Sequence, residues 1–479
     1  MLFNSFQFLI FFPIVYVLYW VLVKQRVFQN LLLIVASYIF YGLWDWRFLI
    51  LLSFSSLLDF TTAFYMGKST SSVTRKRLLY VSLIGQLSIL GFFKYFNFFI
   101  ENFKVLFSHI GFKPDFFTLH VILPVGISFY TFQTLSYVID VYRKKMQPTS
   151  DIISFFSFVS FFPQLVAGPI ERAYNMLPQF SRNREFRFID FKDGLRLILS
   201  GFFKKIVIAD NCCIIVDQIF GMHQYNHGLV LIFGSFLFAF QIYGDFSGYT
   251  DIARGLARLL GFHLSINFFY PYFSKSIKEF WHRWHISLST WFRDYVYISL
   301  GGNRSGKIKT ETNLISTFTL SGLWHGANWT FILWGFINGI YLVFEKNLAF
   351  IGKMIAVPGR LRSAFQIIFT FLLINITWIF FRSKNLHDTF RYFKGIVVNL
   401  FESNALSILH KELFPKGYIA IFLVCILVFL EWTNRSKIHF LDIAHYPWVK
   451  RITIYFIVIL ITLMFGSFFD IHEFIYFQF

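Results

Sequence analysis

Charged residues are scarce in this chain. Only 14% of its 479 residues are charged and 56% are hydrophobic, whereas about 25% of the residues in an average soluble domain are charged. The mean hydropathy is +0.58. This composition excludes a soluble globular protein. Because one helical span takes about 20 residues, the length leaves room for roughly ten to fourteen spans, which also excludes a single-span receptor.

Acidic residues and cysteines are few as well. The chain has 25 Asp and Glu against 44 Lys and Arg, a net charge of +19. In a membrane protein this excess indicates basic loops that face an anionic leaflet, so we expect lipid contact and no nucleic-acid partner. Two of the three cysteines, Cys212 and Cys213, are adjacent, and Cys425 lies in an apolar run. This pattern supports neither a disulfide framework nor a zinc cluster, and we expect no bound metal or cofactor.

Long uncharged runs predict the membrane spans. They cover residues 1–23, 27–44, 78–93, 116–139, 152–170, 218–244, 312–344, 363–381, 417–430 and 452–469, and the run 48–67 is broken only by Asp59. Since the first run has no basic residue before it and no small-residue cleavage site after it, we interpret it as a retained helix. The predicted fold class is all-α, a polytopic integral membrane protein with about 10–13 transmembrane or re-entrant helices.

Two of these runs are unusual. The loops alternate between rich and poor in basic residues until 152–170, after which the alternation fails. A re-entrant segment broken at Pro163, Gly168 and Pro169 would restore it, and the alternative is an ordinary kinked span. The run 312–344 is too long for one untilted span and contains several glycines, so we expect a bend or a pair of shorter helices there.

His325 is the first candidate for chemistry. No charged residue lies between Glu311 and Glu345, and ionisable residues at membrane depth are functional candidates by default. A buried neutral imidazole can act as a general base toward a hydroxyl group. We expect Gly322 and Gly326 to leave space beside the ring for a substrate. The alternative is a structural histidine hydrogen-bonded to a neighbouring helix.

A second candidate is the stretch 275–294. Helical spacing places four polar residues on one side and four apolar residues on the other. The polar set is Lys278, His282, His285 and Ser289, and the apolar set is Phe280, Trp284, Leu288 and Trp291. Such a helix belongs at a cavity mouth or lies flat on the cytoplasmic surface. Two histidines three positions apart could ligate a metal, but no carboxylate or thiol partner is close in sequence.

Two further groups of charges adjoin apolar runs. Asp245, Asp251 and Arg254 could pair and hold two helix ends together, and we favour a structural role for them. Lys204 and Lys205 could contact the phosphates of an acyl donor, or their ammonium groups could extend to the membrane surface. The chain has no GxSxG, HExxH, P-loop or GxGxxG motif, which leaves transport or a transfer reaction inside the bilayer.

Several sequence blocks resemble the membrane-bound O-acyltransferase (MBOAT) family. The blocks lie at 279–304 (EFWHRWHISLSTWFRDYVYISLGGNR), 320–329 (LSGLWHGANW), 123–133, 161–170, 201–205 and 245–252. They are most similar to the bacterial branch that O-acetylates alginate and peptidoglycan, and the likeness covers roughly residues 1–400. The family's architecture is a ring of spans around a central tunnel. The resemblance implies a single domain over 1–479, with N-terminal spans at 1–115, a conserved core at 116–345 and C-terminal spans at 363–479.

The resemblance also implies roles for individual residues. His325 matches the family's nearly invariant membrane histidine, which is assigned as the catalytic base. His285 matches a second conserved polar position, in or beside the reaction tunnel. Further tunnel or donor-binding candidates are Trp324, Asn328, Trp281, Ser289, Lys204, Lys205 and Lys278. This branch usually has arginine at the position of His282, which argues against a catalytic role for that residue.

These implications define the expected function. An acetyl group from a cytoplasmic thioester, acetyl-CoA, would pass through the bacterial cytoplasmic membrane to O-acetylate an exported or cell-envelope polysaccharide. A separate extracytoplasmic transferase commonly completes the reaction in this branch. The basic stretch 275–309 would attract the anionic donor. The alternatives are an acyl-group transporter in which His325 gates or relays protons, and a scaffold with no chemistry of its own.

Overall fold

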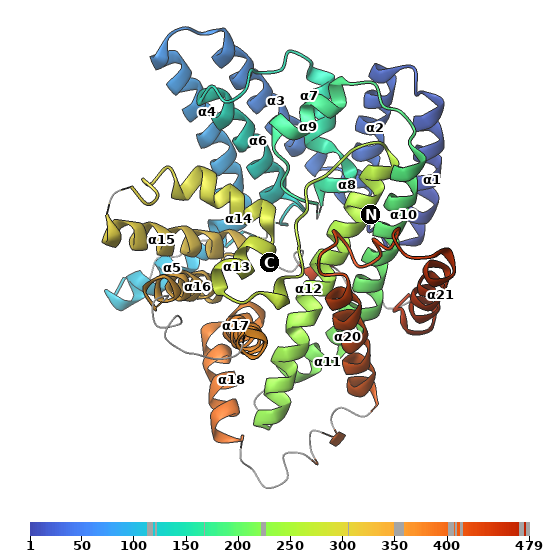
Figure 1. The fold of residues 1–479 in the computed structure, drawn as a ribbon. Helices are drawn as coiled ribbons and strands as arrows, with labels where there is room; N and C mark the ends of the chain where they lie inside the picture. The colour runs from blue at the N-terminus through green and yellow to red at the C-terminus, as the bar shows by residue number, and fades with distance from the viewer. Residues whose placement is uncertain are drawn as a thin grey trace. The chain divides into compact units, whose positions relative to one another are not determined.

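In the structure, a computed structural model, the regular elements of the described residues are helices (Figure 1), and no strand occurs among them. These residues are 1–112, 118–119, 122–166, 168–221, 227–304, 306–348, 359–400, 407, 410–411, 415–468 and 474–475. Parts of the predicted runs 116–139, 152–170, 218–244 and 452–469 lie outside them. The all-α prediction is confirmed.

The chain divides into two compact units, Met1–Gly194 with Leu256–Ser265, and Leu195–Gly255 with Ile266–Phe479. The helices that belong wholly to the first unit are α1 (Phe6–Val21), α2 (Arg26–Asp45), α3 (Phe48–Lys68), α4 (Ser72–Leu90), α5 (Phe96–His109), α6 (Ile127–Tyr142), α7 (Ile152–Ser160), α8 (Phe162–Leu165) and α9 (Ala173–Ser181). Helices α10 (Phe188–Phe202) and α12 (Gly228–Leu259) each contribute to both units. The single-domain division implied by the resemblance stays a prediction.

Helices α3, α4 and α6 pack against one another in the first unit. The charge that interrupts the apolar run 48–67, Asp59, is fully buried in this packing. Its carboxylate accepts hydrogen bonds from Ser82 Oγ at 2.6 Å and Gln86 Nε2 at 2.8 Å. Because a buried carboxylate is costly unless it is hydrogen-bonded, the polar partners on α4 explain how this span accommodates a charge.

The stretch 152–170 forms no continuous span. Helix α7 ends at Ser160, Phe161 leaves the helical conformation with φ −49° and ψ 106°, and α8 is only four residues long and ends at Leu165, before Gly168 and Pro169. The predicted break is therefore confirmed, and its relation to the membrane stays a prediction. Downstream, Arg172 and Arg184 are buried. Arg184 donates to Gln29 Oε1 at 3.0 Å, so part of the basic residues that upset the loop alternation are buried and hydrogen-bonded.

The remaining helices belong to the second unit. They are α11 (Asp210–Gly221), α13 (Ile277–Arg283), α14 (Ile286–Phe292), α15 (Lys307–His325), α16 (Trp329–Leu348), α17 (Gly359–Arg382), α18 (Leu386–Val398), α20 (Lys416–Thr433) and α21 (Trp448–Phe465). π-Helical turns at Phe203–Ala209 and Arg293–Tyr297 extend α10 and α14. The predicted run 218–244 corresponds from Gly228 onward to α12, a candidate membrane span that continues to Leu259, whereas residues 218–221 end α11 and residues 222–226 lie outside the described part of the chain.

The predicted pair of helices in 312–344 is confirmed. Helix α15 ends at His325, the chain is extended at Gly326, and α16 begins at Trp329 and packs along α15 (Figure 1). The contact is close because glycines lie at the crossing. A Cβ at Gly322 would overlap the carbonyl oxygen of Phe331, and one at Gly335 would overlap that of Phe318. Glycine therefore permits the two backbones to approach.

Seven helical stretches of the described chain are long and apolar enough to cross a membrane. They are Arg26–Asp45, Phe48–Lys68, Ser72–His109, Gly228–Leu259, Gly359–Arg382, Lys416–Thr433 and Trp448–Phe465, and α1 is a shorter apolar helix. Many large apolar side chains on these helices are exposed, as expected for contact with lipid. The chain is a multi-pass membrane protein, and the expected total of 10–13 transmembrane or re-entrant helices stays a prediction.

Candidate active site

The stretch 275–294 is two helices, so the predicted continuous amphipathic helix is wrong. Trp284 is extended, with φ −101° and ψ 127°, and His285 has φ +42°, in the left-handed region. Asn267 stabilises this break: its backbone carbonyl accepts from the Ile286 N–H at 2.9 Å, and its side-chain Oδ1 accepts from the Ser287 N–H at 3.1 Å. The turn thereby satisfies amides that a helix would have paired.

His285 is consequently buried, with 1% of its surface exposed, and does not lie on a surface helix. Its Nδ1 lies 3.2 Å from Asn267 Oδ1. The ring packs edge-on against Phe246, with centroids 4.6 Å apart, and against Trp324 at 6.2 Å. His285 lies in none of the seven candidate membrane spans, and burial lowers its pKa to about 3, which keeps the imidazole neutral at physiological pH.

His325, the last residue of α15, is 4% exposed. Its ring packs edge-on against Trp324 and Trp334, with centroids 5.0 Å away in both cases, and against Phe381 at 5.3 Å. Trp324 thus contacts both histidine rings. Three aromatic partners from α15, α16 and α17 restrict the imidazole to one orientation, which suits a positioned base.

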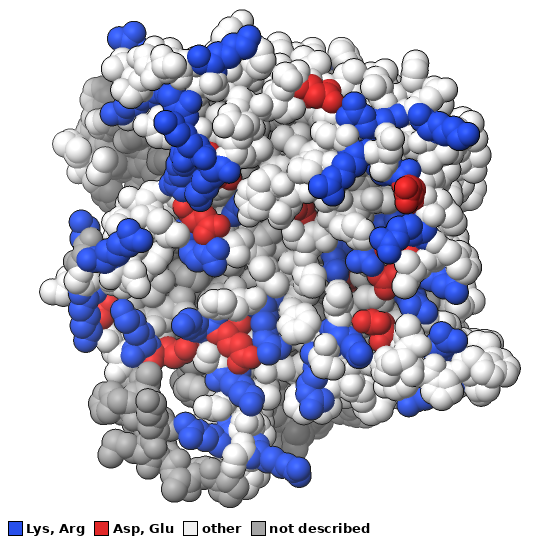
Figure 2. Space-filling view, turned by 45° about the horizontal axis from the view of Figure 1, so that its top comes forward, with Lys and Arg blue, Asp and Glu red and all other residues white. Residues whose placement is uncertain are grey.

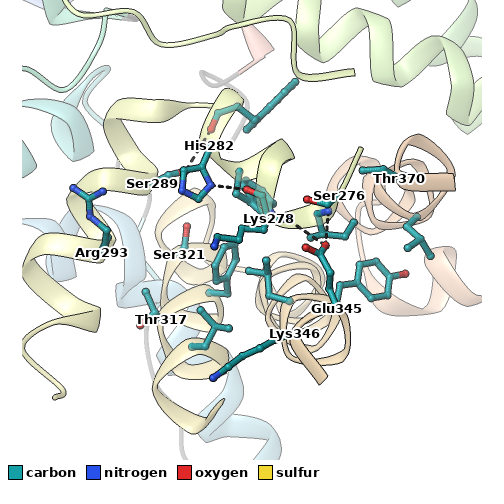
Figure 3. A pocket seen from close by; sticks show the side chains of 18 of the residues that line it. Ser276, Lys278, His282, Ser289, Arg293, Thr317, Ser321, Glu345, Lys346 and Thr370 are labelled. Carbon is teal, nitrogen blue, oxygen red and sulfur yellow. Dashed lines mark hydrogen bonds between the residues drawn. The ribbon is translucent and has the colours of Figure 1, made fainter. Parts of the chain in front are cut away.

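Both histidines line one cavity of about 1270 Å³ in the second unit. Figure 3 shows part of its lining. The side chains come from α13, α14 and its π-helical turn, α15, α16 and α17. On α15, Thr317 and Ser321 are one turn apart and precede His325 by one further turn, so that hydroxyl groups lead along the helix to the imidazole.

The same cavity is lined by a mixture of titratable groups that is rich in cations. Its charged and titratable lining residues, besides the two buried histidines, are Lys275, Lys278, His282, Arg293, Tyr297, Tyr341, Glu345, Lys346 and Arg362. Lys275, Lys278 and Lys346 are exposed, and no ion pair of theirs is found within the described ranges. Figure 2 shows that Lys and Arg side chains are also widespread on the face in view. The cavity suits an anionic ligand.

Glu345 has a local structural contact at the cavity. Its Oε2 accepts from the backbone N–H of Ile277 at 2.6 Å and of Lys278 at 3.2 Å, as Figure 3 shows. A carboxylate at the first turn of α13 satisfies amides that have no partner within the helix. His282 Nδ1 lies 2.6 Å from the Lys278 carbonyl oxygen, so a local hydrogen bond holds that ring.

Not every predicted tunnel residue lines this cavity. Trp281, Ser289 and Lys278 do, whereas Trp324 packs between the histidines and is absent from the lining. Asn328 caps α16, since its Oδ1 accepts from the Thr330 N–H at 3.0 Å and its Nδ2 donates to the Lys384 carbonyl at 2.7 Å. A side chain fixed at a helix end in this way has a structural role.

Gly322 and Gly326 do not leave the expected space for a substrate beside His325. A Cβ at Gly326 would overlap the ring of Phe331, and one at Gly322 would overlap the backbone of the same residue. The glycines therefore admit α16 and not a substrate, and that prediction is wrong. The cavity reaches His325 along other side chains, among them Thr317, Ser321 and Trp281.

Lys204 and Lys205 do not line the cavity. They lie in the π-helical turn Phe203–Ala209, are 4% and 1% exposed, and form buried ion pairs. Lys204 Nζ is 2.9 Å from Asp251 and 3.4 Å from Glu431, and Lys205 Nζ is 2.8 Å from both Asp210 and Asp245. We call these six residues the buried ion-pair cluster. The ammonium groups of Lys204 and Lys205 are thus buried and paired with carboxylates.

The predicted structural trio takes part in this cluster. Asp245 and Asp251 supply two of its carboxylates, and Arg254 Nη1 lies 3.3 Å from Asp251 Oδ1 on the same helix. The pair Arg254–Asp251 lies within the trio, as expected, and Asp245 and Asp251 also join α12 to the π-helical turn after α10. The residues that sequence reasoning missed are Asn267, Glu345, Lys346 and Arg362, which lie outside the motifs and carry no local signal; Lys275 and Arg293 lie in the basic stretch that was singled out.

Together, the fold and site define a class: a multi-pass helical membrane protein with two buried histidines on one cation-rich cavity. The sequence profile of the MBOAT, membrane-bound O-acyltransferase family matches residues 147–382, which include both histidines. The chain belongs to this family, because it also shares 43% identity over 397 residues with a relative, over 82% of this chain and 79% of that protein. It is therefore an O-acyltransferase.

The relatives bear more specific names. The one just described is named probable alginate O-acetylase AlgI and comes from Pseudomonas putida. A protein named peptidoglycan O-acetyltransferase from Helicobacter pylori is 37% identical over 428 residues, 83% of this chain and 80% of its own. A teichoic acid D-alanyltransferase from Streptococcus thermophilus is 31% identical over 240 residues, 46% of this chain and 56% of its own.

Proposed function

We propose that this protein transfers acetyl groups from a cytoplasmic thioester, acetyl-CoA, for the O-acetylation of an exported or cell-envelope polysaccharide. The observation that carries the proposal is the single cavity that joins two buried histidines to exposed cations. The names of the alginate and peptidoglycan relatives support an acetyl group and a polysaccharide acceptor. The proposed acceptor is therefore a polysaccharide of the exported or cell-envelope class.

The chemistry at His325 is general base catalysis. A hydroxyl oxygen, of the polysaccharide or of the extracytoplasmic transferase that relays the acetyl group to it, attacks the thioester carbonyl carbon, so that a C–O bond forms and the C–S bond breaks. The imidazole takes the hydroxyl proton, and the same proton returns to the leaving thiolate sulfur. No oxidant, reductant or metal enters the balance. The aromatic rings around His325 exclude water, which protects the thioester from hydrolysis.

The donor is inferred from charge. A coenzyme A thioester carries several phosphate charges at the end of a long uncharged arm. The exposed Lys275, Lys278 and Lys346 offer ammonium groups to phosphates, and the buried histidines lie on the same cavity at hydroxyl-bearing and aromatic walls. A charged head at the mouth and a reactive thioester at the histidines match this distribution.

We further propose that the protein lies in the bacterial cytoplasmic membrane and delivers the acetyl group across it to an extracytoplasmic transferase. The apolar helices and the family support a membrane location. The basic stretches support a cytoplasmic mouth for the cavity, because lysine and arginine are enriched on that side of bacterial membranes.

The central test removes one imidazole. Wild-type protein and His325→Ala are purified, reconstituted in lipid vesicles and supplied with radiolabelled acetyl-CoA, and release of free coenzyme A thiol is measured. Because a positioned base contributes about 10² to 10⁴ in rate, the variant should lose that factor. Equal turnover by both proteins would overturn the role of His325. No release of thiol by wild type, even when the extracytoplasmic transferase and its polysaccharide are supplied, would overturn the donor.

His439→Ala is the matched control. His439 is as buried as His325, at 2% exposed, but does not line the cavity. Both variants are normalised to the folded fraction by size-exclusion chromatography. A loss common to both would trace to packing, whereas a loss confined to His325→Ala would trace to the reaction.

A further inference from the structure

Asn267 is fully buried, with 0% of its surface exposed, and its side chain lies against the ring of His285. Its Oδ1 is within hydrogen-bond distance of three groups: His285 Nδ1 at 3.2 Å, the Ser287 N–H at 3.1 Å and Ser287 Oγ at 2.9 Å. One side-chain oxygen therefore contacts the histidine ring and the backbone that follows it.

The orientation of the Asn267 amide is not ambiguous. A backbone N–H can only donate, so the atom that faces the Ser287 N–H must be the acceptor, the carbonyl oxygen. The reversed amide would place an NH₂ group against that N–H, and two donors would meet in a buried site. Oδ1 is thus the atom that His285 Nδ1 approaches.

The protonation of the histidine follows from this orientation. An amide oxygen offers only lone pairs, so a favourable contact requires a hydrogen on Nδ1. In a neutral imidazole only one ring nitrogen carries hydrogen, and Nε2 then bears the lone pair.

We propose that Asn267 is a positioning residue, which holds His285 in the Nδ1-protonated tautomer and leaves Nε2 as a hydrogen-bond acceptor toward the cavity during acyl transfer. The proposal rests on the proposed function only for the involvement of His285 in the reaction. Asn267 itself is absent from the cavity lining and acts through the ring.

The surroundings of the ring support this assignment. Phe246 packs edge-on at 4.6 Å, and Phe268 and Trp324 lie 6.3 Å and 6.2 Å away, so uncharged aromatic groups restrict its rotation. The backbone is restricted as well, since the Ile286 N–H donates to the Asn267 carbonyl and His285 has φ +42°. Asn267 thereby fixes both the left-handed turn and the ring that projects from it.

The first arm of the test reads the tautomer directly and needs no substrate. Protein with isotope-labelled histidine is reconstituted in lipid vesicles, and solid-state NMR records the ring nitrogen and carbon shifts, with His285 identified by difference from His285→Gln. We expect a neutral ring protonated at Nδ1 in wild type, and loss of that signal in Asn267→Leu. A wild-type ring protonated at Nε2 overturns the proposal, whatever the donor.

The second arm measures turnover of acetyl-CoA against pH. Asn267→Leu removes the acceptor and should lower kcat by about 10²-fold, with KM for acetyl-CoA little changed. Asn267→Asp keeps an acceptor at the same place and should retain more activity. The carboxylate of Asn267→Asp stabilises the imidazolium and raises the pKa of His285 from its low native value. Because the ring must be neutral, the acidic limb of the rate profile should move to higher pH.

Asn313→Leu is the control for a merely structural asparagine. Asn313 is also buried and holds a turn, since its Nδ2 donates to the Leu300 and Gly302 carbonyls at 3.1 Å. It should change neither the tautomer signal nor the acidic limb. Equal loss of kcat in Asn267→Leu and Asn267→Asp without a shifted limb overturns the proposal. The expected tautomer in a wild type that does not turn over acetyl-CoA, even when the extracytoplasmic transferase and its polysaccharide are supplied, upholds Asn267 and refutes the proposed donor.

Discussion

Lysine occurs in two opposite environments in the second unit. In the buried ion-pair cluster, Lys204 and Lys205 are almost fully buried and each contacts two carboxylates within 3.4 Å. At the cavity, Lys275, Lys278 and Lys346 are exposed, and no ion pair of theirs is found within the part of the chain that is described. The local sequences differ, since Lys204 and Lys205 lie in an apolar run whereas Lys275 lies between two serines and Lys346 between Glu345 and Asn347, but they do not identify which acids pair with which lysine.

The difference shows that lysines with carboxylate partners have a structural role, whereas lysines without them are available to bind a ligand. The cluster draws its acids from α11, α12 and α20, and Tyr243 adds a hydrogen bond to Glu431 at 2.8 Å. Removing one partner there leaves a buried charge without compensation. At the cavity, Glu345 is occupied by the α13 backbone, which leaves the lysine ammonium groups to a ligand.

The largest effect is expected from Lys205→Met. It leaves Asp210 and Asp245 facing each other in a buried site, and breaking such a pair costs about 3 to 5 kcal/mol. The measurement is thermal unfolding of the purified protein, monitored as the loss of the monodisperse peak in size-exclusion chromatography after heating. Lys278→Met, at the cavity, is the matched substitution and should unfold like wild type.

A second variant keeps this prediction testable if Lys205→Met does not fold. Lys205→Met combined with Asp210→Asn and Asp245→Asn removes the uncompensated charges and should recover part of the lost stability. Unfolding temperatures of Lys205→Met and Lys278→Met that coincide would show that the two lysine environments do not differ as described.

An intermediate effect is expected from the cavity lysines together. Replacing Lys275, Lys278 and Lys346 by methionine should weaken the binding of free coenzyme A by about tenfold, because an exposed charge pair contributes about 0.2 to 1 kcal/mol. Calorimetric titration in detergent measures the Kd. Dephospho-coenzyme A, which has one phosphate fewer, should lose less on the same substitution; an unchanged Kd for both would remove these lysines from the donor site.

The smallest effect is expected from salt on the wild-type protein. Raising ionic strength from 0.1 M to 1 M shortens the screening length from about 10 Å to 3 Å, so the Kd for coenzyme A should rise a few-fold. The unfolding temperature should change little, because buried pairs are screened much less. The Kd and the unfolding temperature are measured in the same buffers. A Kd that does not change with ionic strength would show that the cavity lysines do not bind the phosphates of coenzyme A.

Sequence patterns predicted the helices and the two histidines but not their setting. The uncharged run 312–344 predicted a pair of helices, and the pair α15 and α16 has its break at Gly326 beside His325. The helical spacing in 275–294 failed at His285, because Asn267 lies eighteen residues earlier and its carbonyl groups replace helical hydrogen bonds. A periodic pattern reports only neighbours within the same helix, so it cannot predict a hydrogen-bond partner outside that helix.

The sequence by itself determined that the protein is helical, crosses the membrane several times and belongs to the MBOAT family. It also identified His325 and His285 as candidate site residues, since apolar runs, motifs and rare polar residues can be recognised locally. Only the tertiary structure decided which lysines are neutralised, why glycines flank His325 and which nitrogen of His285 is protonated. Each of these depends on a group on another element: Asp245 on α12 and Glu431 on α20, Phe331 on the next helix, and Asn267 before α13. Burial and hydrogen bonding act through space, and the sequence alone does not specify those distances.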